Sequence, residues 1–453
     1  MTVLWAKQAL LTHGWAKDVA ITVAADGRIA TVTPDQPATG ARHDILLPAP
    51  ANLHSHAFQR AMAGMTEARG PNPTDTFWTW RQLMFRFLDR LSPEHVQAIA
   101  AFVQMEMLEA GYATNVEFHY LHHRPGGGAY DDPAEMAGRI AAAAEQSGIG
   151  LTLLPVHYQF GGCDRRALGP GQIRFGTDPA QFARLHAASR EAVQHLPEDT
   201  VLGTAPHSLR AVSSDGLAAA IALGDGPVHM HLAEQRAEVV EVEAAYGLRP
   251  VEYLLDTAVV DHNWCLIHCT QMLPHETRQL AQTGAVAGLC PITEANLGDG
   301  IFDGVRWLEH HGHFGIGSDS NIRIGLTEEL RQLDHSQRLR DHSRAALASP
   351  SHSTGRRLYQ AAVIGSAQAA GRAAGTIAPG HWADLLALDG QATDLLGLQG
   401  DTLLDAFIFA GSDRMISDVW SAGRHMVRDG QHIAREAITT AYRATLRDLR
   451  EAV

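Results

Sequence analysis

The middle of the chain alternates short apolar runs with longer alanine-, glutamate- and arginine-rich stretches that predict helices, such as PAEMAGRIAAAAEQSG. Eight apolar runs occur, at residues 45–56, 112–120, 150–158, 201–209, 227–234, 264–270, 285–293 and 313–320. Nearly continuous apolar runs are typical of parallel strands buried on both faces, and eight β–α units predict a (β/α)8 barrel. An open doubly wound sheet is the alternative. No GxGxxG or GxxxxGK[ST] motif follows the early strands, which disfavours the nucleotide-binding forms of that sheet.

Both ends of the chain have the pattern of short strands joined by turns. Alternating apolar runs flank Asp26-Gly27, as in a hairpin, and strand-like runs also flank Asp429-Gly430. Because chain termini often lie close together, we expect the two ends to form one small β-sandwich domain. The predicted fold is therefore α/β, with a TIM-type barrel at 49–371. The small domain combines 1–48 with 372–453, and the latter segment ends in a helix.

The composition is that of a large globular protein. The 453 residues are 45% hydrophobic and 19% charged, which allows a sizeable core. A net charge of −14, without a Lys/Arg-rich stripe, disfavours nucleic acid and anionic membranes as partners. No leader pattern, CxxC pair or membrane-length apolar run occurs, so we expect a cytoplasmic protein with free thiols. A homodimer is the default expectation for its assembly.

Histidines and acids gather at the carboxyl ends of the predicted strands. His54 and His56 close the first strand, where alternation places residues i and i+2 on one side. His231 lies near the end of the fifth strand, His268 ends the sixth and Asp319 ends the eighth. Buried strands tolerate such groups poorly unless they are paired, and barrel enzymes carry their active sites at this end. Three imidazoles and a carboxylate, with room for water, predict a catalytic site of the zinc type.

Some histidines are assigned no metal. Only one of His229 and His231 can point inward with the first pair. We prefer His231 because it lies nearer the strand end and leaves Glu234 just beyond it to act on substrate. His207 ends the fourth run and is a candidate for substrate contact. We expect the others to lie in loops or to be solvated, among them His122, His123, His310, His311 and His313.

With these residues placed, the chain resembles the amidohydrolase superfamily and, within it, the formimidoylglutamate deiminase family. The motifs that carry the likeness are NLHSHAFQRAMAGMTE (52–67), PHSLRAV (206–212), HLAEQ (231–235), PITEANLGDGIF (291–302) and GSDSN (317–321). The resemblance implies one zinc ion, or another divalent ion, held by His54, His56, His231 and Asp319. It implies catalytic roles for Glu234, His268 and Asp319. It implies substrate contacts from Gln59, Arg81, Tyr120, His207 and Arg210.

Lysine is nearly absent from this chain. The two lysines are Lys7 and Lys17, and the remaining basic residues are arginines. Two-metal members of the resembled superfamily often bridge their ions with a carbamylated lysine after the fourth strand. The sequence therefore excludes a lysine-bridged pair of metal ions.

The resemblance implies hydrolysis of the formimino C=N group of N-formimino-L-glutamate to N-formyl-L-glutamate and ammonia, in histidine degradation. This small substrate is a dianion, and arginine binds carboxylate bidentately, so Arg210 and Arg81 are the expected partners. Alternatively, Arg81 is a solvent-exposed arginine on the surface of a helix and does not bind the substrate. A sibling zinc deaminase acting on guanine or a thioadenosine is the nearest rival function. A non-catalytic scaffold is another rival, which the complete set of ligands disfavours.

The sequence leaves two questions open. The first is the role of the residues that flank Asp319, namely Ser320, Asn321 and Arg323. The second is whether the helical insertion at about 66–110 is a lid or a dimer contact.

Overall fold

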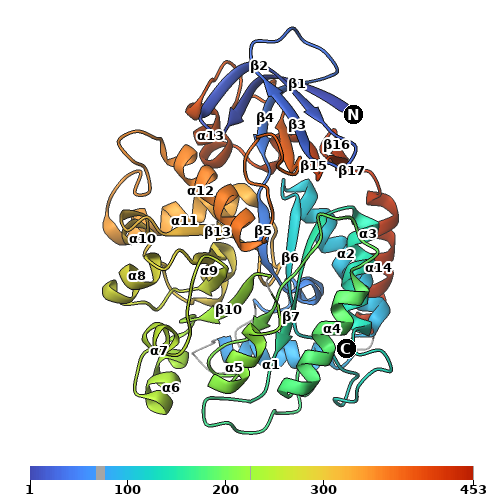
Figure 1. The fold of residues 1–453 in the computed structure, drawn as a ribbon, viewed down its shortest axis with the longest axis vertical. Coiled ribbons are helices and arrows are strands. Elements are labelled where there is room, and N and C mark those ends of the chain that lie inside the picture. Colours follow the sequence, from blue (N-terminus) through green and yellow to red (C-terminus); the bar gives the residue numbers. More distant parts are fainter. Residues whose placement is uncertain (68–76, 225, 452–453) are drawn as a thin grey trace.

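The computed structural model describes residues 1–67, 77–224 and 226–451. Parallel strands form a central barrel with helices around it, and a small β-rich domain lies at one end (Figure 1). The barrel strands are β5 (Ala51–Ser55), β6 (Thr114–His119), β7 (Gly150–His157), β8 (Val201–Leu202), β9 (Ala205–Pro206), β10 (Val228–Leu232), β11 (Trp264–His268), β12 (Val286–Leu289) and β13 (His313–Ile316). Each lies within one of the eight predicted runs, so the predicted α/β barrel is confirmed.

The barrel closes at two seams. One sheet runs from β5 to β8 and the other from β10 to β13, and every pairing within them is parallel. The fourth run forms two short strands, β8 and β9, which both pair with β7. Bridges between Thr204 and Val228, and between Ser55 and Asp319, join the two sheets. The second seam places the first and eighth strands side by side.

Local sequence signals account for where many helices begin. Ser92, Asp178, Ser213 and Ser353 each accept a backbone N–H of the first turn, and several helices also carry proline at their first position. The α-helices are α1 (Phe77–Leu88), α2 (Pro93–Glu109), α3 (Glu135–Ser147), α4 (Pro179–Ala192), α5 (Ser214–Ile221), α6 (Arg236–Tyr246), α7 (Pro250–Thr257), α8 (Pro274–Ala281), α9 (Pro291–Leu297), α10 (Gly304–Glu309), α11 (Leu326–Asp341), α12 (Thr354–Ala369), α13 (Asp401–Asp405) and α14 (Arg435–Glu451). Short 3-10 or π turns span Ala57–Met62, Ala406–Ala410 and Asp413–Met415. Within the described ranges, no helix is long and apolar enough to cross a bilayer.

Strands from both ends of the chain share one sheet. They are β1 (Thr2–Leu11), β2 (Gly14–Val23), β3 (Ile29–Thr33), β4 (Ala41–Pro48), β14 (Leu385–Leu388), β15 (Ile416–Ser421), β16 (Arg424–Arg428) and β17 (Gln431–His432). Their order is β17-β16-β15-β14-β4-β1-β2-β3, with β1 and β4 parallel and the other pairs antiparallel.

This sheet folds over its own apolar face, as the predicted β-sandwich requires. The N–H of Ile29, at the start of β3, donates to the carbonyl of His381 at 2.8 Å, so the far edge returns to the segment before β14. Leu4, Leu385 and Trp420 pack together in the core that the sheet encloses. The predicted C-terminal helix is α14, which runs along α2 on the outside of the barrel (Figure 1).

A buried ion-pair cluster joins the small domain to the barrel. Arg372, just after α12, lies 3.0 Å from a carboxylate oxygen of Asp199 and 3.1 Å from one of Asp384. Arg424 of β16 donates to both oxygens of Asp199 at 2.8 Å. Asp199 precedes β8, so the cluster lies at the amino ends of the strands, away from their carboxyl ends.

We expect Arg372→Met to lower the free energy of unfolding by about 3–5 kcal/mol, because the buried carboxylate of Asp384 would lose its cation. Urea denaturation followed by circular dichroism measures the change. Arg306→Met is the matched control, since Arg306 pairs with Asp303 in a more exposed place and should cost less than about 1 kcal/mol. Equal losses in the two variants would contradict the prediction.

Candidate metal centre and active site

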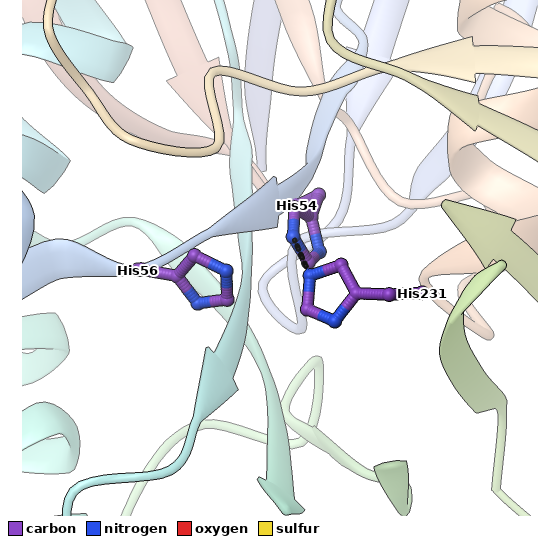
Figure 2. A group of neighbouring side chains, drawn as sticks. All are labelled: His54, His56 and His231. Carbon is purple, nitrogen blue, oxygen red and sulfur yellow. Dashed lines mark hydrogen bonds between the residues drawn. The ribbon is translucent and has the colours of Figure 1, made fainter. Parts of the chain in front are cut away.

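Three imidazoles converge where β5 and β10 end (Figure 2). His54 belongs to β5, His56 follows it directly, and His231 belongs to β10. The Nε2 atoms of His54 and His231 lie 3.1 Å apart, and one ring nitrogen from each of the three histidines lies within 4.8 Å of the others. All three side chains are buried. The structure therefore brings together the histidines that the sequence predicted.

Asp319 completes the group from the end of β13. Its Oδ1 lies 3.5 Å from Nε2 of His54 and 3.3 Å from Nε2 of His56. Ligands about 2.0–2.1 Å from a tetrahedral ion lie about 3.3 Å from one another. The observed spacings match that value, and three nitrogens with one carboxylate oxygen form a donor set suited to a divalent ion. These residues therefore fit a bound metal ion.

Hydrogen bonds and burial prepare the imidazoles as ligands. Nδ1 of His56 lies 3.0 Å from the carbonyl of Phe118, and Nδ1 of His231 lies 3.1 Å from that of His207. Each Nδ1 therefore carries the proton, and each Nε2 keeps its lone pair for a metal. Burial lowers the pKa of His54 to about 3 and also lowers the pKa values of His56 and His231. The rings are thus neutral, which is the form that binds metal ions.

The predicted catalytic pair lies beside this centre. Nε2 of His268 is 3.8 Å from Oδ2 of Asp319 and 3.9 Å from Oε1 of Glu234. The other oxygen of Glu234 is 3.7 Å from the guanidinium of Arg210. Burial raises the pKa of Glu234, while His268 and Arg210 counteract the rise. Burial alone would lower the pKa of His268, but Glu234 and Glu294 outweigh it and raise the value to about 10. Proton donors and acceptors therefore surround one face of the centre.

The centre opens into a cavity of about 550 Å³, including its mouth. All the side chains predicted to contact substrate line this cavity, namely Gln59, Arg81, Tyr120, His207 and Arg210. Gln59 donates to the hydroxyl of Tyr120 at 2.8 Å, and Arg81 donates to the hydroxyl of Tyr158 at 2.7 Å. The structure places these residues around one space, and their contacts with substrate stay predictions.

Sequence reasoning missed several residues around the cavity. Glu294 lies 3.3 Å from Nδ1 of His268, outside the cavity lining. The lining itself includes Trp80, Met84, Tyr158, Phe175, Leu297 and Ser320. Two signals could have found some of them. Tyr158 ends the third apolar run, and Glu294 lies inside the motif PITEANLGDGIF.

The remaining candidates have simpler environments. Nε2 of His229 lies 2.8 Å from the carbonyl of Ala369, a structural contact that fits the preference for His231. Asn321 is buried and donates to Ser55 and to the carbonyl of His56, whereas Arg323 is 64% exposed and pairs with Glu328. Within the predicted insertion, α1 supplies part of the cavity wall, and 68–76 lie outside the described residues.

Comparison with known proteins identifies the class. The sequence pattern of the Amidohydrolase family matches residues 45–426, and the chain belongs to this family of hydrolases. A second pattern, described as formimidoylglutamate deiminase HutF, N-terminal domain, matches residues 1–44. The chain is 46% identical to a formimidoylglutamate deiminase from Pseudomonas aeruginosa, over 99% of this chain and 100% of that protein. It is 23% identical to a 5'-deoxyadenosine deaminase from Methanothermobacter thermautotrophicus, over 85% of this chain and 83% of that one.

Solved structures agree with this assignment. An amidohydrolase from Brucella melitensis is 45% identical and has a TM-score of 0.95, with 99% of this chain and 100% of that chain covered. An adenosine deaminase from Xanthomonas campestris, solved with bound zinc, has a TM-score of 0.83 at 22% identity and covers 99% of this chain and 98% of its own. The second likeness concerns the fold alone.

We expect the purified protein to hold about one divalent ion per chain, and His231→Ala to lose most of it because a ligand is removed. Metal analysis by plasma mass spectrometry measures the content. Glu234→Gln is the matched control, since it replaces a buried side chain of the same cavity that is not a predicted ligand. If His231→Ala kept the metal content of the parent protein, His231 would not be a ligand.

Proposed function

We propose that the protein is a zinc-dependent formimidoylglutamate deiminase of histidine degradation, which hydrolyses N-formimino-L-glutamate to N-formyl-L-glutamate and ammonia. The observation that carries the proposal is a single cavity holding the histidine–aspartate centre together with two guanidinium groups. The near full-length identity of 46% to the Pseudomonas aeruginosa relative supports the same assignment. Three imidazoles and one carboxylate are a preferred donor set of catalytic zinc, which supports zinc as the ion.

Zinc held by His54, His56, His231 and Asp319 would lower the pKa of water to about 7 and so supply a nucleophile at neutral pH. The chain's own residues then move protons. Oδ2 of Asp319 faces His268 and is the proposed acceptor of the proton from that water. Nε2 of His268 lies between Asp319 and Glu234, where it can orient the attacking oxygen. Glu234 is proposed to deliver a proton to the formimino nitrogen, so that ammonia leaves.

The proposed substrate carries two carboxylates, and the cavity offers matching cations. Arg210 is buried beside Glu234, and Arg81 reaches in from α1, so both can pair with carboxylate in a place shielded from water. The side-chain carbonyl of Gln59 is buried and has no hydrogen-bond partner among the described residues. It is a suitable acceptor for a substrate N–H. His207 and Tyr120 complete the proposed binding surface.

The proposal also includes the compartment, the assembly and the domain bounds of the protein. The enzyme acts in the cytoplasm on a small dianion, as a homodimer and without a nucleic-acid partner. Its barrel domain spans 49–371, and its small domain combines 1–48 with 372–453.

Ammonia release is expected from N-formimino-L-glutamate with a kcat/KM at least about 10³-fold above that for guanine or 5'-methylthioadenosine, because those neutral bases bring no carboxylate to the cavity for Arg210 or Arg81 to bind. A coupled ammonia assay measures the three rates on one preparation of known metal content. Faster turnover of guanine or of the thioadenosine would replace this proposal with the rival deaminase function. Metal-loaded protein that turned over none of the three would indicate a non-catalytic relative.

Arg210→Met should raise the KM for N-formimino-L-glutamate by about 30-fold, which corresponds to about 2 kcal/mol for a lost charge-assisted hydrogen bond. Steady-state kinetics measures KM and kcat separately. Arg166→Met is the matched control, because Arg166 is exposed, pairs with Asp164 and does not line the cavity. A change of less than about threefold in the KM of Arg210→Met would remove Arg210 from carboxylate binding.

A further inference from the structure

Glu294 has no part in the proposed mechanism, yet it is buried against a catalytic residue. It lies in α9, directly after β12, and is only 5% exposed. Its Oε1 is 3.3 Å from Nδ1 of His268 and accepts the backbone N–H of Cys290 at 2.9 Å. Glu294 is absent from the lining of the cavity. Its carboxylate therefore contacts the side of the His268 ring that faces away from Glu234 and Asp319.

The contacts of His268 on the cavity side do not fix the orientation of its ring. Its contacts to Asp319 and Glu234, at 3.8 and 3.9 Å, are longer than hydrogen bonds and do not fix the tilt of the ring. The contact to Glu294 is within hydrogen-bond range for a buried pair. The backbone of His268 also has a φ of +73°, which is outside the usual range for residues other than glycine. Such a conformation persists only where its surroundings determine it.

Glu294 is itself held firmly. The N–H of Cys290 fixes its Oε1, and its backbone carbonyl accepts the N–H of Asp299 at 2.9 Å. The helix is anchored from α11, where buried Glu329 accepts the N–H of Ile292 at 2.9 Å. An acceptor on a rigid support can define the orientation of an imidazole ring.

We propose that Glu294 is a positioning residue for His268. Its Oε1 accepts the Nδ1–H, so the ring is held with Nε2 facing the gap between Glu234 and Asp319. Glu294 touches neither the substrate nor the metal ligands, and its effect passes through His268 alone. The inference deepens the proposed function and rests on it for the role of His268.

His268, Cys290 and Glu294 also form a group compact enough to hold a metal ion. The hydrogen bonds account for this compactness, because one oxygen of Glu294 serves both Nδ1 of His268 and the N–H of Cys290. A second metal ion at this place is therefore an outcome that the experiment must exclude.

The first test compares Glu294→Ala with Glu294→Gln. Loss of the acceptor in the alanine variant should lower kcat by about 10- to 100-fold while KM changes less than threefold, because substrate contacts are untouched. The glutamine variant keeps an oxygen at the Oε1 position, so its kcat should stay within about fivefold of the parent. Metal content should be unchanged in both. A loss of one equivalent of metal would overturn the proposal in favour of a second metal site.

Glu329→Ala is the matched control, because it removes the buried acceptor that supports the same helix without touching His268. If it lowered kcat as much as Glu294→Ala, the effect would be a general loosening of α9 and the proposal would fail. If Glu294→Ala does not fold, Glu294→Asp replaces it, since its side chain is one methylene shorter and cannot reach Nδ1 from the same backbone. A kcat for Glu294→Asp equal to that of the parent would then overturn the proposal.

A double-mutant cycle with His268→Asn completes the test. A residue that acts only through His268 should add no further loss once that ring is gone, so the double variant should match His268→Asn in kcat. A further loss of tenfold or more would overturn the proposal. All ratios are measured on the substrate that the parent turns over fastest. A parent that prefers another substrate would refute the proposed function, while the ratios would still decide the role of Glu294.

Discussion

The site depends on the seam where the end of β13 meets the end of β5. There the N–H of Asp319 donates to the carbonyl of His54 at 2.9 Å, and the N–H of His56 donates to the carbonyl of Asp319 at 3.0 Å. The backbones can approach this closely because Gly317 has no side chain, since a Cβ at that position would lie 2.6 Å from the nitrogen of His54. Closing the barrel and bringing Asp319 beside His54 and His56 are therefore one event. A barrel left open at this seam would separate the Asp319 carboxylate from the two imidazoles.

Strained strand ends give the side chains their directions. Ala233, His268 and Asp319 follow or end β10, β11 and β13, and each has a φ between +47° and +73°. A straight strand would continue its alternation and carry the next side chains into the wall of the barrel. The left-handed turn instead aims His268 and Asp319 at a common point, at a cost of order 1–3 kcal/mol per residue. The buried hydrogen bonds of Asn321 to Ser55 and to the His56 carbonyl help to hold the seam in this conformation.

Much of this arrangement could be predicted from the sequence because it follows from periodicity. Apolar runs mark buried strands, and strand ends share one face of a barrel, so His54, His231 and Asp319 could be grouped without coordinates. The contact between Glu294 and His268 was not predicted, because it arises only when the fold brings the carboxylate of α9 beside the end of the sixth strand. The two-part fourth strand was also beyond reach, since β8 and β9 are separated by a close approach to Pro227 that is a property of the closed barrel. Contacts that form only when the barrel closes leave no local pattern in the amino-acid sequence.

Both lysines of the chain lie outside the barrel. Lys7 and Lys17 lie in β1 and β2 of the small domain, so the barrel has no primary amine that could carry a bridging carbamate. The end of the fourth strand instead presents His207 to the cavity, followed by Arg210. An arginine keeps its charge even when buried, whereas a buried lysine loses its proton readily. A chain with a net charge of −14 can therefore keep permanent positive charge in the cavity where the proposed substrate would place its carboxylates. Local placement of charge, and not net charge, decides what this cavity accepts.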